Sequence, residues 1–151
     1  MELSKENFRA LGIIFYALLA GMLLYAAITV FLISSREYPP EPLLGTPMND
    51  LLCMGGYVMA MIFFARFIDG MWQKQIPTVL RMKRSGLAHY RANVIIRLAI
   101  IEGGGLFSVT FALLSGNLAL LLVTLLAAGA MWLVRPTEEE FLERYDETLR
   151  S

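Results

Sequence analysis

The fold of this chain is decided by residues 94–134, which read VIIRLAIIEGGGLFSVTFALLSGNLALLLVTLLAAGAMWLV. Two apolar runs, at residues 94–115 and 118–134, are separated only by a short Ser-Gly-Asn turn. A helix that crosses a bilayer needs about 20 mostly apolar residues, at a rise of about 1.5 Å each. The first run is therefore long enough to cross a membrane. So short a turn also predicts that the two helices pack as an antiparallel hairpin.

Two further apolar runs, at residues 11–33 and 51–72, precede this hairpin. Of the 151 residues, 57% are hydrophobic and 17% are charged, and the mean hydropathy is +0.59. Globular domains are about 45–50% apolar and about 25% charged. Four spans would use about 80 apolar positions. The composition therefore predicts an all-α membrane protein, folded as one domain over residues 1–151 into a four-helix transmembrane bundle.

The same composition excludes several classes of protein. A chain this apolar is not a soluble enzyme, a disordered segment or a nucleic-acid-binding domain. A single cysteine, Cys53, excludes an internal disulfide, and a single histidine, His89, excludes paired-histidine metal motifs. The sequence contains neither a phosphate-binding loop nor a nucleophile–base pair. We therefore predict no enzyme activity and no bound metal or cofactor.

Lysine and arginine are distributed unevenly among the segments between the apolar runs. The segment 36–50 contains only Arg36, and the turn at 115–117 contains none. Short loops rich in these residues stay on the cytoplasmic side. We therefore predict that both termini, the middle loop at 74–92 and the tail at 135–151 are cytoplasmic. The residues that carry this prediction are Lys5, Arg9, Lys74, Arg81, Lys83, Arg84, Arg91, Arg135, Arg144 and Arg150.

The middle loop is predicted to be partly helical. Pro77 suits the first turn of a helix. Its basic face either binds anionic lipid headgroups, at about 1 kcal/mol per basic residue, or serves only to fix the topology. Topology alone already requires this charge, so it is the simpler interpretation. The apolar stripe beside the basic face consists of Ile76, Val79, Leu80 and Leu87.

The tail is predicted to form a short acidic amphipathic helix. Thr137 followed by Glu140 is a capping-box signature, and acids in a first turn suit the helix dipole. Leu142, Tyr145 and Leu149 share one face, at spacings of three and four. This helix either docks on the basic middle loop or recruits a cytosolic partner. Docking is the more economical interpretation, because both charge signs lie on one membrane face.

The first and third apolar runs match each other at an offset of 82 residues. Arg9 falls on Arg91, just outside the membrane. Both runs enter from the cytoplasm, so the chain is predicted to consist of two parallel hairpin repeats. Ala20 stands at the position of Glu102, so only one copy carries a carboxylate. The other matches pair Ile13 with Ile95, Ile14 with Ile96, Ala17 with Ala99, Gly21 with Gly103, Leu24 with Leu106 and Tyr25 with Phe107.

Three charged residues lie near the cytoplasmic ends of the second and third spans. Arg66 and Asp69 are three residues apart on one helix face and are predicted to pair. Such a pair would anchor the helix at the interface. Arg97, one turn inside the third span, either extends to the headgroups or reaches Asp69 across the helix pair.

Glu102 is the candidate ion or proton site, because it lies about 12 Å into its span at about 1.5 Å per residue. A carboxylate at that depth costs a few kcal/mol, so it should be protonated or paired. Arg97 lies on another face of the helix, so Arg66 or a group on another span is the better partner. Glu102 either exchanges a proton or cation or fixes the fold by a hydrogen bond across the bundle. The residues that follow, predicted to allow close helix packing, are Gly103, Gly104 and Gly105.

The stretch 97–108, RLAIIEGGGLFS, resembles the carboxylate helix of rotary-ATPase proteolipid (c-type) subunits, which place an essential Glu or Asp in mid-span. This resemblance implies a ring-forming subunit that carries protons or sodium ions, with Glu102 as the ion site. The sequence departs from that family in two places. Gly55 and Gly56 stand in place of a glycine ladder on the second span, and the middle loop is long and basic.

A second resemblance covers most of the chain and is carried by HYRANVIIRLAIIEGGGLF at 89–107, ALLSGN at 112–117 and RPTE at 135–138. These stretches are similar to an uncharacterised four-span family of Bacteroidota inner membranes. The resemblance implies a four-span architecture in the bacterial inner membrane. We expect an accessory or scaffold protein that can self-associate; the alternative is a proton- or cation-translocating subunit centred on Glu102. The expected partners are the lipid bilayer, with anionic lipid at the middle loop, and further copies of the chain, but no nucleic acid.

Overall fold

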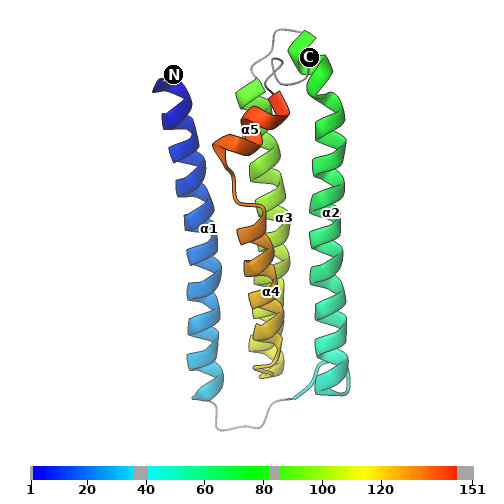
Figure 1. Cartoon of the computed structure of the whole chain (residues 1–151). Coiled ribbons are helices and arrows are strands. Elements are labelled where there is room, and N and C mark those ends of the chain that lie inside the picture. The colour runs from blue at the N-terminus through cyan, green and yellow to red at the C-terminus, as the bar shows by residue number, and fades with distance from the viewer. Residues whose placement is uncertain (1, 36–40, 82–85, 146–151) are drawn as a thin grey trace.

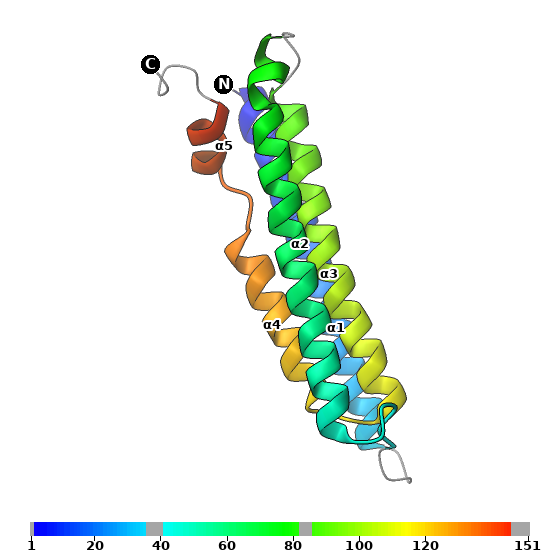
Figure 2. The same cartoon turned by 90° about the vertical axis from the view of Figure 1, so that its right-hand side faces the viewer.

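The computed structural model describes residues 2–35, 41–81 and 86–145 (Figure 1). Helices α1 to α4 lie side by side and alternate in direction, and α5 lies across the end where α1 begins (Figures 1 and 2). The described residues contain no strand, so the prediction of an all-α chain is confirmed. The helices are α1 (Glu2–Ser34), α2 (Pro47–Arg81), α3 (Gly86–Ser115), α4 (Leu120–Leu133) and α5 (Glu138–Tyr145).

Helix α3 is the centre of the arrangement. It packs against α1, α2 and α4, and 44% of its most apolar stretch is buried, compared with 17% in α1 and in α2. A helix with neighbours on three sides buries most of its circumference, whereas the outer helices bury one face each. The core side chains from all four helices include Phe15, Val58, Leu98 and Met131.

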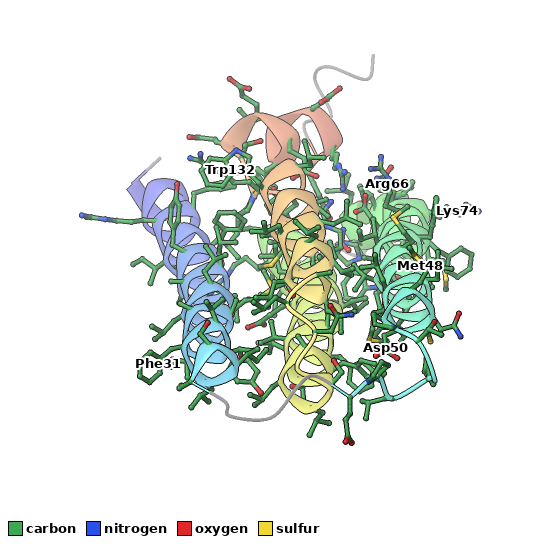
Figure 3. All side chains as sticks on the ribbon, turned by 90° about the horizontal axis from the view of Figure 1, so that it is seen from below. Phe31, Met48, Asp50, Arg66, Lys74 and Trp132 are labelled. Atoms are coloured by element: carbon green, nitrogen blue, oxygen red, sulfur yellow. The ribbon has the colours of Figure 1, made fainter. Side chains whose placement is uncertain are left out.

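Three helices are long and apolar enough to cross a membrane, over Phe8–Ser34, Pro47–Leu80 and Gly86–Ser115. Their outer faces expose large apolar side chains, such as Phe31 at 72% and Phe63 at 65% exposure. Phe31 points away from the other helices (Figure 3). Soluble monomers rarely expose apolar patches on this scale. The chain therefore fits a multi-pass membrane protein.

Helix α4 differs from the predicted fourth span at 118–134. It has 14 residues, and its length of about 21 Å at about 1.5 Å per residue is less than the thickness of a hydrocarbon core, about 30 Å. It reaches the length of a span only together with α5, to which it is bent by 57°. Val134 leaves the helical conformation two residues before Pro136, which cannot donate a helical hydrogen bond. Because α2 has 35 residues, the two predicted hairpins differ greatly in their second helices.

The residues of the predicted middle loop, 74–92, are mostly helical, which corrects the expected position of Pro77. Helix α2 continues to Arg81 and α3 begins at Gly86, so Pro77 lies inside α2 and not in the first turn of a separate helix. The physical reason is burial: Ile76 is only 1% exposed, and Leu80 packs against the same core. This apolar contact offsets the hydrogen bond that Pro77 removes. Lys83 and Arg84 lie outside the described residues.

The turns at the opposite end are closed by side-chain hydrogen bonds. The carboxylate of Asp50 accepts from the backbone N–H groups of Leu43 and Leu44, at 3.1 and 2.8 Å. In the turn between α3 and α4, Gly116 adopts a φ of +70°, which favours glycine. The predicted hairpin of residues 94–134 is thus present, although its second helix is short.

Candidate functional site

Two arginines and two acids from three helices form a network of ion pairs, which we call the charge cluster: Asp69 on α2, Arg97 on α3, and Glu140 and Arg144 on α5. Arg97 Nη1 lies 3.4 Å from Asp69 Oδ2 and 3.2 Å from Glu140 Oε1. Arg144 completes the network, with 2.8 Å from Nη1 to Asp69 Oδ1 and 2.7 Å from Nη2 to Glu140 Oε1. Two positive charges thus meet two negative ones, so the cluster is neutral.

Neutral hydrogen-bond donors complete the cluster. Asn93 donates from Nδ2 to Asp69 Oδ1 at 2.7 Å, and Tyr90 donates from its hydroxyl to Glu140 Oε2 at 2.7 Å. Tyr90 is fully buried and Arg97 is 4% exposed. Buried charges stay charged only when paired and hydrogen-bonded in this way. The cluster therefore holds α5 to α2 and α3.

The charge cluster tests the predictions for Arg97 and Arg66. Arg97 reaches Asp69 across the helix pair, which is one of its two expected positions. The predicted pair of Arg66 with Asp69 is wrong: among the described residues Arg66 makes no ion pair, and it is exposed. The reason is competition, because Asp69 already accepts from Asn93 and pairs with two better-placed arginines.

Aromatic side chains attach α5 to the same end of the molecule. The rings of Phe8, Tyr90 and Phe141 lie 5.4–6.0 Å apart. The hydroxyl of Tyr145 shares a 2.6 Å hydrogen bond with Nδ1 of His89. Burial raises the pKa of Tyr145 to about 12, which leaves its phenol protonated at neutral pH. Helix α5 is thus docked by rings as well as by charges.

The tail helix docks within the chain, the more economical of its two expected placements. It contacts His89 and Tyr90 of the predicted middle loop. The ion pairs of Glu140 within the described residues, however, are with Arg97 of α3 and with Arg144 of α5 itself. Thr137 Oγ1 accepts from the backbone N–H of Glu140 at 3.1 Å, as the capping-box signature predicts. The Glu140 side chain is used in the charge cluster, a role that sequence spacing cannot reveal. Leu149 lies outside the described residues.

A cavity of about 500 Å³ lies beside the charge cluster, between α2 and the segment that joins α4 to α5. Two of its arginines, Arg66 and Arg135, are outside the cluster. The guanidinium of Arg135 stands 5.8 Å from the ring of Tyr16 and 5.7 Å from the ring of Trp132. The charged residues that line the cavity are Arg66, Asp69, Arg97, Arg135, Glu140 and Arg144.

Glu102 lies away from this end and is half-buried. Among the residues that the structure describes, it makes no hydrogen bond and no ion pair, so neither Arg66 nor Arg97 is its partner. Contacts on either side, from Phe8 to Tyr90 and from Tyr25 to Thr110, place it level with residues 17–20 of α1. That stretch reads ALLA and offers no polar side chain.

The three glycines after Glu102 have different surroundings. A Cβ on Gly104 would lie 3.3 Å from Cβ and Cγ of Met61 on α2. A Cβ on Gly105 would overlap Sδ of Met22 on α1 and lie 3.1 Å from Cβ of Ala127 on α4. Close packing at Gly103 is not found, because nothing lies within 4 Å of a Cβ there. Two of the three glycines thus lie where neighbouring helices come close.

The described part of the chain holds no group of three or more His, Cys, Asp or Glu residues that could bind a metal ion. Comparison of the chain with protein-family models, with curated proteins and with solved structures finds no match. The two resemblances noted in the sequence therefore stay predictions. The site is defined by its geometry alone: a neutral charge cluster, an adjacent cavity lined by arginines, and a separate carboxyl group that has no partner among the described residues.

Proposed function

We propose that this chain is an accessory or scaffold subunit of the bacterial inner membrane, with both termini in the cytoplasm and with the capacity to self-associate. The observation that carries the proposal is that the four charged residues of the charge cluster pair with one another. They hold α5 to α2 and α3, and their charges cancel, so none of the four is an unpaired charge available for chemistry. A structural role follows from that balance.

The apolar faces support the same proposal. Ile13 and Leu24 on α1 are 65% and 64% exposed, and Phe63 and Phe67 on α2 are 65% and 63% exposed. Helices α1 and α2 lie on opposite sides of α3 (Figure 1). Their exposed apolar side chains can contact lipid or a second membrane protein, which supports the proposal of a transmembrane bundle.

Proton or cation translocation through Glu102 is the second candidate function. The observation in its favour is that Glu102, in the middle of α3, has no polar partner among the described residues. An intramembrane carboxyl group without a structural partner is a functional hypothesis by default. Against it stands the apolar stretch at residues 17–20 of α1, level with Glu102, which offers no relay group.

The number of copies in the assembly separates the two functions. The full chain is purified in a mild detergent and its oligomeric mass is measured by native mass spectrometry. A scaffold subunit should appear as a dimer or another small assembly. A ring of many copies would overturn the scaffold proposal in favour of translocation, because ion-carrying proteolipids work as rings.

A further inference from the structure

At the end of the molecule that carries α5, helix α4 stops short of α1 and α2 (Figure 1). The glycines of α3 provide a common level from which this difference can be counted. Met61 of α2 lies against Gly104. Met22 of α1 and Ala127 of α4 lie against Gly105. We call this the glycine level, and distances along each helix toward the α5 end follow from it at about 1.5 Å per residue.

The exposed apolar surface extends further from the glycine level on α1 and α2 than on α4. Ile13 of α1 is 65% exposed and Met71 of α2 is 45% exposed, and they lie about 14 and about 15 Å from this level. Helix α4 ends at Leu133, about 9 Å from the same level. The apolar surface that can face lipid is therefore shorter at α4 by about one helical turn.

The cavity beside the charge cluster lies where α4 has stopped. Leu133 and Val134 line it on one side, and Arg66 and Gly70 of α2 line it on the other. Arg66 is about 8 Å from the glycine level, so the charged lining begins deeper in the bundle than Met71, where the exposed apolar surface of α2 ends. Charged side chains therefore extend down into the bundle between α2 and the end of α4.

The charges of the lining decide what can fill the cavity. Arg66 is exposed and makes no ion pair among the described residues. The side chains of Asp69, Glu140 and Arg144 line the same cavity and keep 14–20% of their surface exposed. A lipid chain in the cavity would remove water from these charged groups, which is costly. The volume of about 500 Å³ has room for many water molecules, each of which takes about 30 Å³ in the liquid.

We propose that water fills this cavity and forms an aqueous indentation in the cytoplasmic half of the transmembrane bundle, beside α4. The inference rests on the proposed membrane location and orientation. It makes the hydrocarbon layer thinner at α4, whose 14 residues extend about 21 Å, than the usual thickness of about 30 Å. Leu133, which is 84% exposed, then faces water although its side chain is apolar.

The test compares two cysteines at equal depth in the full chain, in a Cys53→Ser background. Phe67 of α2, like Leu133, is about 9 Å from the glycine level; it is 63% exposed but does not line the cavity. Inverted membrane vesicles are treated with a membrane-impermeant maleimide, and labelling rates are measured by mass spectrometry. We expect Leu133→Cys to react at a rate comparable to that of Glu139→Cys on α5. Phe67→Cys should react at least about 100-fold more slowly, because a thiol in apolar surroundings does not ionise.

A second variant fills the cavity. Gly70 lines it, and no atom lies within 4 Å of the place where a Cβ would stand. Gly70→Leu should therefore slow the labelling of Leu133→Cys about tenfold, because the new side chain displaces part of the water. The labelling of Glu139→Cys should not change, which controls for an effect of Gly70→Leu on the whole cytoplasmic end.

Glu139→Cys reports the orientation separately. If it were labelled only in right-side-out vesicles, the proposed orientation would be wrong, and the two matched cysteines would be compared on that face. With Glu139→Cys labelled, a rate for Leu133→Cys as low as that for Phe67→Cys would overturn the aqueous indentation. Fast labelling of both would overturn it as well, because water would then reach the outer face of α2 equally. No effect of Gly70→Leu would show that the cavity is not the route of the reagent, which would also overturn it.

Discussion

At the scale of single residues, Arg97 is the residue on which the polar end of the molecule depends. It is the one cation of α3 in the charge cluster, it is 4% exposed, and it pairs with acids of two other helices. A buried ion pair contributes little net stability, but removal of one partner leaves the other charges uncompensated. The stability of the fold is therefore sensitive to the loss of any one member of the charge cluster, although the intact cluster is neutral. Gly104 and Gly105 are the other positions where one residue decides a specific contact, because neighbouring helices come close there.

Replacement of Arg97 should destabilise the protein strongly. Arg97→Met leaves Asp69 and Glu140 with Arg144 as their remaining cation, which we expect to cost about 3 kcal/mol of unfolding free energy. The measurement is reversible unfolding in mixed micelles, followed by circular dichroism. Arg66→Gln is the control and should change stability by less than about 0.5 kcal/mol. Equal effects of both substitutions would show that the ion pairs do not hold α5.

The glycines of α3 provide a second, internally controlled prediction. Gly105→Ala should lower the unfolding free energy by about 1–3 kcal/mol, because its Cβ meets Met22 and Ala127 on two neighbouring helices. Gly103→Ala meets open space and should be neutral or stabilising by up to about 1 kcal/mol. Both variants are measured by the same unfolding assay. Similar losses at the two positions would argue against the close contact at Gly105.

The chemical state of Glu102 can be measured directly. A carboxyl group among apolar side chains favours its neutral form, and hydrophobic carbodiimides modify that form. We expect Glu102 to be labelled selectively in membranes, with labelling that fades as the pH rises and is absent in Glu102→Gln. Glu138 and Glu139, which are exposed on α5, serve as internal controls. Labelling of these acids alone, at every pH, would remove Glu102 as a proton site.

At the scale of elements, α5 shows how a short helix becomes ordered. It has eight residues, too few for a stable isolated helix. Its order comes from the Thr137 cap, the charge cluster and the rings of Phe141 and Tyr145. Helix α4, with 14 residues, ends where α5 can fold back on α2 and α3.

Removal of α5 tests this description. A chain truncated after Pro136 should keep the helical content of α1 to α4, because their core includes few side chains of α5. Its melting temperature should fall by several degrees, since Tyr90 and Arg97 lose their bond to Glu140. Circular dichroism of the purified truncated chain measures both quantities. Loss of expression or of helical content beyond α5 would mean that α5 is required for the fold.

At the scale of the whole molecule, the start of α1 and helix α5 lie at one end, and the turn before α2 and the turn before α4 lie at the other (Figures 1 and 2). Charge follows this division, because the charge cluster and the arginine-lined cavity are at the end that carries α5. The predicted orientation places that end in the cytoplasm.

Cysteine accessibility in intact cells tests the orientation. In a Cys53→Ser background, Glu41→Cys introduces a thiol at the exposed turn before α2, and Glu139→Cys introduces one on α5. We expect a membrane-impermeant thiol reagent to label the first variant on spheroplasts and the second only after lysis. The reverse pattern would place α5 outside the cytoplasm.

The sequence by itself determined the all-α class, the three long apolar spans and the short hairpin turn, because apolar length and turn composition are local properties of the chain. It also located Thr137 as a helix cap. The charge cluster was decided only by the tertiary structure. Its members lie on three helices, and sequence spacing favoured the neighbour Arg66 over the distant Arg144 as the partner of Asp69. Ion pairs depend on distances in space, and those distances are set by the docking of α5 against α2 and α3.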